Sequence, residues 1–226
     1  MKHRHERAAG LADRLIHETV PSRIWSRDPG VWHAAPGSAD ARSIQTRLGW
    51  LDAPEAMAPE LDRVLALARA VRAEGITAVY LLGMGGSSLC AEVFRQVFGV
   101  ADDHPELFVL DTTDEETITA AAARLDPAAT LFLVSSKSGG TVEVASMERF
   151  FWSRTTAALG ADAGRHFVAV TDPGTGLFTL ARERGYREVF VNPPDIGGRF
   201  SALSLFGLVP AALIGAPVRE ILAGAS

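Results

Sequence analysis

Side chains that can bind an anion are concentrated in one short stretch near the middle of the chain. Ser136, Lys137 and Ser138 are followed by two glycines and then by Thr141. The segment 130–134 before them is apolar and rich in strand-forming residues, and a helical pattern begins after Thr141. Glycines let backbone N–H groups approach a ligand, and the N-terminus of a helix carries partial positive charge. The stretch therefore predicts a phosphate-binding loop between a strand and a helix.

The same residues have a purely structural interpretation. The hydroxyl of Ser138 or Thr141 could cap the following helix, and Lys137 could be a charge in solvent. A capping hydroxyl and a ligand-binding hydroxyl use the same geometry, so the two interpretations are compatible.

A second glycine-rich turn occupies residues 83–88 and reads Gly-Met-Gly-Gly-Ser-Ser. It is not a complete dinucleotide fingerprint, because Ser88 stands where the third glycine is required and Asp111 lies too far along the chain. It also lacks the lysine of a nucleotide P-loop. We therefore expect the backbone at Gly86 and the hydroxyl of Ser87 to face a ligand. The alternative is that these glycines serve only tight packing between strand and helix.

The third candidate is Gly198 with Arg199, which points to catalysis. Adjacent glycines at 197–198 let the backbone pass close to a ligand. The guanidinium of Arg199 suits a carboxylate, a phosphate or a developing oxyanion. Alternatively, Arg199 could pair with Asp195 or with a helix carboxylate. The six histidines lie in the N-terminal portion or away from the carboxyl ends of the predicted strands, so none is a candidate general base.

Each of these motifs follows a predicted strand. The expected strands are 78–82, 107–110, 130–134, 167–170 and 188–191, and they alternate with expected helices at 87–98, 115–125, 142–159 and 176–184. Nearly every strand residue is apolar, which is typical of strands covered on both faces. The alternation predicts an α/β fold with three layers, in which a five-stranded, doubly wound parallel sheet of flavodoxin-like type binds ligands beyond its carboxyl edge.

The rest of the chain divides into an arm and a domain. Residues 1–58 predict an N-terminal helical and irregular arm, with a helix closed by Pro21 and a short helix near 40–48. Its tryptophans could cover the core or form a dimer contact. Residues 59–226 predict the ligand-binding domain, which ends in an apolar helical run broken at Pro210.

Composition narrows the class of partner and the location. The net charge is −5 and the basic residues are scattered, so we expect no nucleic-acid partner and no anionic membrane partner. The single cysteine, Cys90, cannot form an internal disulfide and is expected to be a small core residue. No apolar run reaches the length of a membrane span, and the N-terminus lacks a signal-peptide core, so we expect a cytoplasmic protein.

Taken in order, the three motifs resemble those of the glucose-6-phosphate isomerase family, whose domains have the sugar isomerase (SIS) fold. The matching segments are 83–89, 136–143 and 197–201 followed by 208–211. Residues 44–54 further resemble the segment leading into the isomerase module of bifunctional transaldolase and glucose-6-phosphate isomerase proteins. The similarity begins near Trp25 and continues to the C-terminus.

The resemblance implies a role for each candidate residue. Residues that would hold the sugar phosphate are Ser136, Lys137, Ser138 and Thr141, with Gly86 and Ser87 beside it and Gly198 near the reacting carbons. Arg199 would be catalytic and stabilise an enediolate. The family interconverts glucose 6-phosphate and fructose 6-phosphate without a metal or a cofactor.

The resemblance also implies that this chain is incomplete as an isomerase. Family members have two SIS domains, and the glutamate base, the ring-opening histidine and a further lysine belong to the second domain and the segment after it. This sequence corresponds to the N-terminal SIS portion, so we expect a homodimer or association with a second SIS-containing chain. The alternative function is a non-catalytic sugar-phosphate sensor or regulatory module. A dinucleotide-dependent enzyme is a weaker third possibility.

Overall fold

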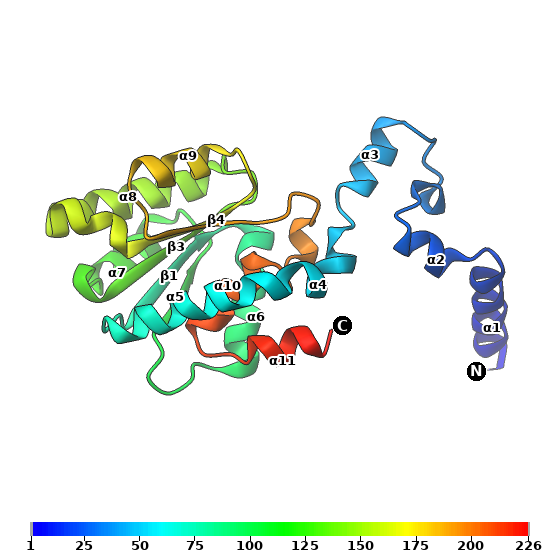
Figure 1. Ribbon diagram of the computed structural model, residues 1–226, viewed down its shortest axis with the longest axis horizontal. Coiled ribbons are helices and arrows are strands. Elements are labelled where there is room, and N and C mark those ends of the chain that lie inside the picture. Colours follow the sequence, from blue (N-terminus) through cyan, green and yellow to red (C-terminus); the bar gives the residue numbers. More distant parts are fainter. Residues whose placement is uncertain (1, 226) are drawn as a thin grey trace.

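A five-stranded parallel sheet forms the centre of the protein (Figure 1). The computed structural model describes the backbone of residues 2–225 and the side chains of residues 10–225. Met1, where the predicted arm begins, and Ser226, where the predicted domain ends, lie outside the described residues. The strands are β1 (Ala78–Gly83), β2 (Glu106–Leu110), β3 (Thr130–Ser135), β4 (Phe167–Thr171) and β5 (Glu188–Val191). Their order in the sheet is β2-β1-β3-β4-β5, and all neighbouring pairs are parallel. The predicted α/β fold class is confirmed.

Helices cover both faces of this sheet, which explains why its strands are apolar on both sides. The helices are α1 (Lys2–His17), α2 (Val20–Trp25), α3 (Ala39–Gln45), α4 (Ala53–Met57), α5 (Leu61–Ala73), α6 (Leu89–Phe98), α7 (Glu115–Ala123), α8 (Val142–Leu159), α9 (Gly176–Glu183), α10 (Leu205–Leu213) and α11 (Val218–Ala223). Alternate strand residues enter two separate cores. Leu131 and Leu133 pack toward α5 and α10, whereas Phe132 and Val134 pack toward α7, α8 and α9.

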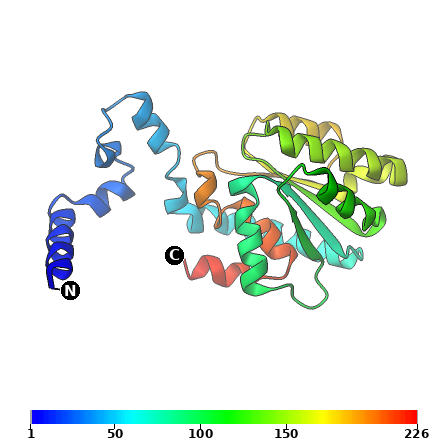
Figure 2. The same cartoon turned by 180° about the vertical axis from the view of Figure 1, so that it is seen from behind.

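The N-terminal arm extends away from the sheet (Figures 1 and 2). Helix α1 lies at the far end of the arm, and α2 and α3 connect it to α4 and α5 beside the sheet. Trp25 and Trp32 are exposed, whereas Trp50, nearer the sheet, stacks on Phe200. Pro21 lies in the first turn of α2 and does not close the first helix, which ends at His17, because proline is well accommodated in the first turn of a helix. That part of the sequence interpretation was wrong.

The apolar run near the C-terminus is one continuous helix, so the predicted break at Pro210 was also wrong. Proline lacks the N–H group that would bond to the carbonyl four residues earlier, which here belongs to Phe206. The thiol of Cys90 donates to that carbonyl at 3.6 Å and supplies the missing partner. The Cys90 side chain is half-buried, and its burial raises the pKa of the thiol.

Among residues 2–225, no helix combines the length and the apolar character needed to cross a membrane.

Candidate functional site

A cavity of about 770 Å³ opens at the carboxyl edge of the sheet. Its walls come from the segments that follow β1, β3, β4 and β5, and from the arm. Strand β2 lies on one side of β1 and β3 lies on the other, so the chain reverses its winding direction between β1 and β3. Open α/β sheets bind ligands at such a switch point, and the cavity lies there.

Seven of the eight predicted site residues line this cavity. They are Gly86, Ser87, Lys137, Ser138, Thr141, Gly198 and Arg199. The eighth, Ser136, is buried and lies outside the lining, with its hydroxyl 3.3 Å from the Thr141 hydroxyl. Ser136 therefore contacts the side chain of a lining residue and lies behind it.

The loop after β3 leaves its hydroxyl groups free of capping bonds. Thr141 occupies the N-cap position of α8, but its side chain makes no capping hydrogen bond. Its hydroxyl lies 3.5 Å from the hydroxyl of Ser138, which in turn accepts from the N–H of Gly140 at 3.3 Å. The hydroxyls therefore cluster at the N-terminus of an eighteen-residue helix, whose partial positive charge favours an anion.

Lys137 is held in place and is not a loose surface charge. Its ammonium group forms an ion pair with Asp172 and donates to the carbonyl of Pro194 at 2.8 Å. The second carboxylate oxygen of Asp172, Oδ1, is buried without a hydrogen-bond partner among the described residues. Burial raises the pKa of Asp172, and the Lys137 charge offsets only part of this effect. The negative charge of a second carboxylate, on Asp195, raises the pKa of Asp172 further.

The glycine turn after β1 contacts the loop that carries Arg199. A side chain at Gly86 would overlap the backbone of Gly198, so the two backbones meet where only glycine fits at position 86. The Ser201 hydroxyl lies 2.8 Å from the carbonyl oxygen of Gly86 and 2.7 Å from that of Gly198. These two motifs, more than a hundred residues apart, form one unit.

Arg199 is exposed, and within the described part of the chain it has no hydrogen-bond or ion-pair partner. Arg199 does not pair with Asp195, which was the alternative interpretation. Asp195 instead accepts a hydrogen bond from Arg27 at 2.8 Å. A permanently charged guanidinium thus faces the cavity unpaired.

Among the lining residues that sequence reasoning did not predict, Thr46 and Arg47 come from the arm. Their only sequence signal is that they fall in the segment 44–54, which resembles the lead into an isomerase module. No local pattern connects them with a loop that lies some 150 residues further along the chain.

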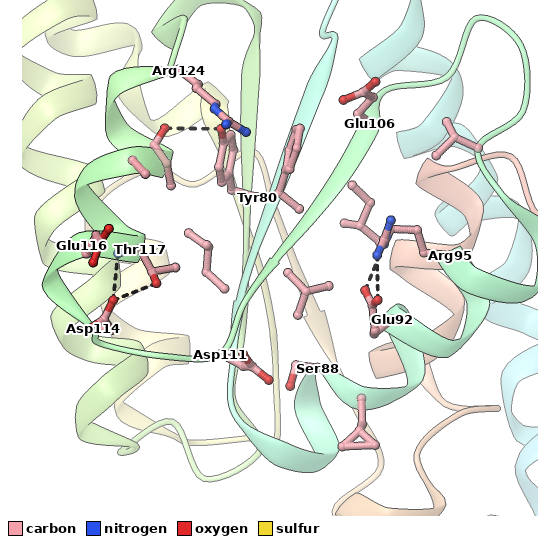
Figure 3. Close-up of a pocket in the computed structure, with 18 of the residues that line it drawn as sticks. Tyr80, Ser88, Glu92, Arg95, Glu106, Asp111, Asp114, Glu116, Thr117 and Arg124 are labelled. Carbon is pink, nitrogen blue, oxygen red and sulfur yellow. Dashed lines mark hydrogen bonds and ion pairs between the residues drawn. The ribbon is translucent and has the colours of Figure 1, made fainter.

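A larger cavity of about 1140 Å³ lies along the edge strand β2, between α6 and α7 (Figure 3). Acidic side chains outnumber basic ones in its lining and include Glu106, Asp111 and Asp114. The arginines that line it are Arg95, which is paired with Glu92 on α6, and Arg124. None of the predicted site residues lines it. Its negative charge makes it a poor site for a phosphate, so the smaller cavity is the candidate site.

Comparison with known proteins agrees with this fold. Residues 66–226 match the family described as phosphoglucose isomerase. A glucose-6-phosphate isomerase of Thermus thermophilus is 35% identical over 179 residues, which are 79% of this chain and 42% of the relative. The corresponding protein of Mycoplasmopsis pulmonis is 36% identical over 185 residues, covering 79% of this chain and 43% of the relative.

Two solved structures share the fold. A hypothetical protein from Thermus thermophilus superposes with a TM-score of 0.79 at 31% identity and covers 97% of this chain and 48% of its own. A glucose-6-phosphate isomerase from Chlamydia trachomatis superposes with a TM-score of 0.63 at 29% identity, over 88% of this chain and 35% of its own.

The fold and the cavity thus define an α/β protein with a cavity lined by hydroxyl and basic side chains at the switch point of a parallel sheet. The chain belongs to the phosphoglucose isomerase family, and the predicted resemblance is confirmed. It spans less than half the length of the curated relatives described above. The division at residues 58 and 59 and the roles of the site residues stay predictions.

Proposed function

We propose that this chain binds glucose 6-phosphate and fructose 6-phosphate in the switch-point cavity and forms the N-terminal part of a glucose-6-phosphate isomerase. The observation that carries the proposal is that the Lys137 loop and Arg199 line the same cavity. The Lys137 ammonium and the hydroxyls of Ser138 and Thr141 bind the phosphate. Ser87 lies beside it, and Ser136 supports Thr141 from behind.

Arg199 acts at the reacting end of the sugar. Isomerisation opens the sugar ring, removes a proton from the carbon next to the carbonyl, and returns it to the adjacent carbon through an enediolate. The guanidinium donates hydrogen bonds to the enediolate oxygens, a contribution of about 3 kcal/mol for a single well-placed donor. The close approach of Gly86 and Gly198 fixes the backbone on either side of that position.

The general base comes from outside this chain. Among the described residues that line the cavity, Asp172 is the only carboxylate, and it is engaged with Lys137. A general base contributes about 10² to 10⁴ in rate, so the chain alone binds substrate and turns it over slowly. A second copy, or a second SIS-containing chain, completes the site. This function places the protein in glycolysis and gluconeogenesis, and therefore in the cytoplasm.

A coupled assay that follows conversion of fructose 6-phosphate to glucose 6-phosphate tests the proposal. Turnover that disappears in Arg199→Ala would support an isomerase. The alternative function, a non-catalytic sugar-phosphate sensor, predicts a different result. The chain would bind fructose 6-phosphate without turnover, both alone and after addition of a second SIS-containing chain. A chain that binds neither sugar phosphate at millimolar concentration would contradict both functions.

A further inference from the structure

We infer that residues 46–52 of the arm form a wall of the sugar-phosphate site, and that Arg47 in this wall binds the sugar end of the ligand. The inference rests on the proposed function for the identity of the ligand. The wall itself rests on three contacts between the arm and the loop 195–200 that carries Arg199.

The first contact is a backbone connection. Leu48 forms an isolated antiparallel bridge with Ile196, and the N–H of Gly49 donates to the carbonyl of Asp195 at 2.9 Å. A side chain at Gly49 would overlap the carboxyl group of Asp195. The arm therefore approaches the loop as closely as a neighbouring strand does, and a larger residue at position 49 would require the Asp195 side chain to move.

The second contact is an ion-pair network. The Arg27 guanidinium donates to Asp195 Oδ2 at 2.8 Å and also binds the carboxylate of Asp52. One arginine of the arm thus joins the arm segment to the loop. Arg27 has a positive φ of 57°, an uncommon conformation for a residue other than glycine.

The third contact is aromatic. Trp50 and Phe200 stack with their ring centroids 5.3 Å apart and their planes at 21°. Phe200 directly follows Arg199, and its ring is otherwise largely exposed. The stack therefore limits the movement of the residue next to the proposed catalytic guanidinium.

These contacts place Arg47 where it can contact a ligand. Arg47 lines the cavity, and its Cβ lies 3.7 Å from the position that a side chain on Gly197 would occupy. Within the described residues it has no hydrogen-bond or ion-pair partner for its guanidinium. The contact at Gly197 sets Arg47 beside the loop of Arg199, so we assign it to the sugar end of the ligand. Its guanidinium suits several oxygen acceptors at once.

Binding measurements with two ligands test the role of Arg47. We expect Arg47→Ala to weaken fructose 6-phosphate binding by about tenfold, as for loss of a charged hydrogen bond, and to leave inorganic phosphate binding within about twofold. Arg47→Lys should recover part of the loss. Arg42→Ala is the matched control, because Arg42 lies on the same arm but bonds to the carbonyl of Gly37.

The outcomes separate this inference from the proposed function. If the wild-type chain binds fructose 6-phosphate and Arg47→Ala binds it equally well, the inference fails alone. An equal loss for both ligands would make Arg47 a phosphate-binding residue and also overturn the inference. If the wild-type chain binds no fructose 6-phosphate, the proposed function fails, and the role of Arg47 fails with it.

Hydrogen exchange tests the wall without any ligand. We expect Arg27→Ala to raise exchange at the amides of Gly49 and Phe200 by about tenfold, and to leave the amides of β3 unchanged. Trp50→Ala should act on the same two amides. Unchanged exchange at both amides in both variants would show that the arm does not hold the loop.

Discussion

Gly86 and Gly198 meet backbone to backbone at the floor of the candidate site, and the Ser201 hydroxyl lies within hydrogen-bonding distance of both carbonyl oxygens. Each belongs to a glycine-rich loop at the end of a different strand. The contact joins the turn after β1 to the loop that carries Arg199. The geometry of the site therefore depends on a position where a methyl group does not fit.

Gly86→Ala should destabilise the protein and disturb the site together. The added methyl meets backbone atoms, which cannot move aside as a flexible side chain can. We expect a loss of about 1–3 kcal/mol in the free energy of unfolding, the range for overpacking, and weaker binding of fructose 6-phosphate. Urea unfolding measures the first and calorimetry the second. In the control Gly10→Ala, the new Cβ has open space, so stability should stay level or rise. Equal stability of the two variants would refute the contact.

Glu148→Ala should be among the more damaging single substitutions in the α8 layer. Glu148 is 3% exposed, accepts from the Tyr186 hydroxyl at 2.6 Å, and forms an ion pair with Arg184. Removing one partner of a buried pair leaves the other uncompensated, at about 3–5 kcal/mol. Tyr186→Phe should cost only about 1 kcal/mol, because Arg184 still binds the carboxylate. If urea unfolding gives Glu148→Ala and Tyr186→Phe similar stability, the ion pair between Glu148 and Arg184 contributes little to the free energy of unfolding.

Asp172→Asn should change how stability depends on pH. Burial raises the pKa of this carboxyl above its ordinary value of 3.8, so the folded chain holds the proton more tightly than the unfolded chain. The stability that the protonated form contributes is complete below the ordinary value and is lost as the pH rises through the folded pKa. Asparagine stays neutral and avoids this loss.

The measurement is urea unfolding of both proteins at about pH 3.5 and about pH 7. Relative to wild type, Asp172→Asn should be more stable at the higher pH than at the lower pH. The opposite trend would mean that the ion pair with Lys137 outweighs burial.

The sheet could be predicted from sequence because its signal is local. Strands buried on both faces are apolar throughout, and the segments before Gly83 and Ser136 show this in a few residues each. Most of the site residues could also be predicted, because they lie in glycine-rich and hydroxyl-rich loops that directly follow those strands in the sequence. Helix α8 was predicted with the bounds that the structure shows.

The contribution of the arm could not be predicted, because it depends on contacts between distant parts of the chain. Arg27 and Asp195 are separated by 168 positions, and neither has an unusual local pattern. The continuity of α10 through Pro210 has a similar cause, since the carbonyl left free is satisfied by Cys90 from another helix. The inward position of Ser136 could not be predicted either, because it depends on how the loop turns after β3 ends at Ser135.

Binding of fructose 6-phosphate to the wild-type chain and to Lys137→Ala tests the central claim most directly. Thermal unfolding with and without millimolar fructose 6-phosphate should show a ligand-dependent rise in Tm for the wild type, because a ligand that binds only the folded state stabilises it. The rise should disappear in Lys137→Ala, which removes the ammonium from the loop that we propose binds the phosphate. No rise in the wild type, or an equal rise in both proteins, would contradict a sugar-phosphate site at this loop.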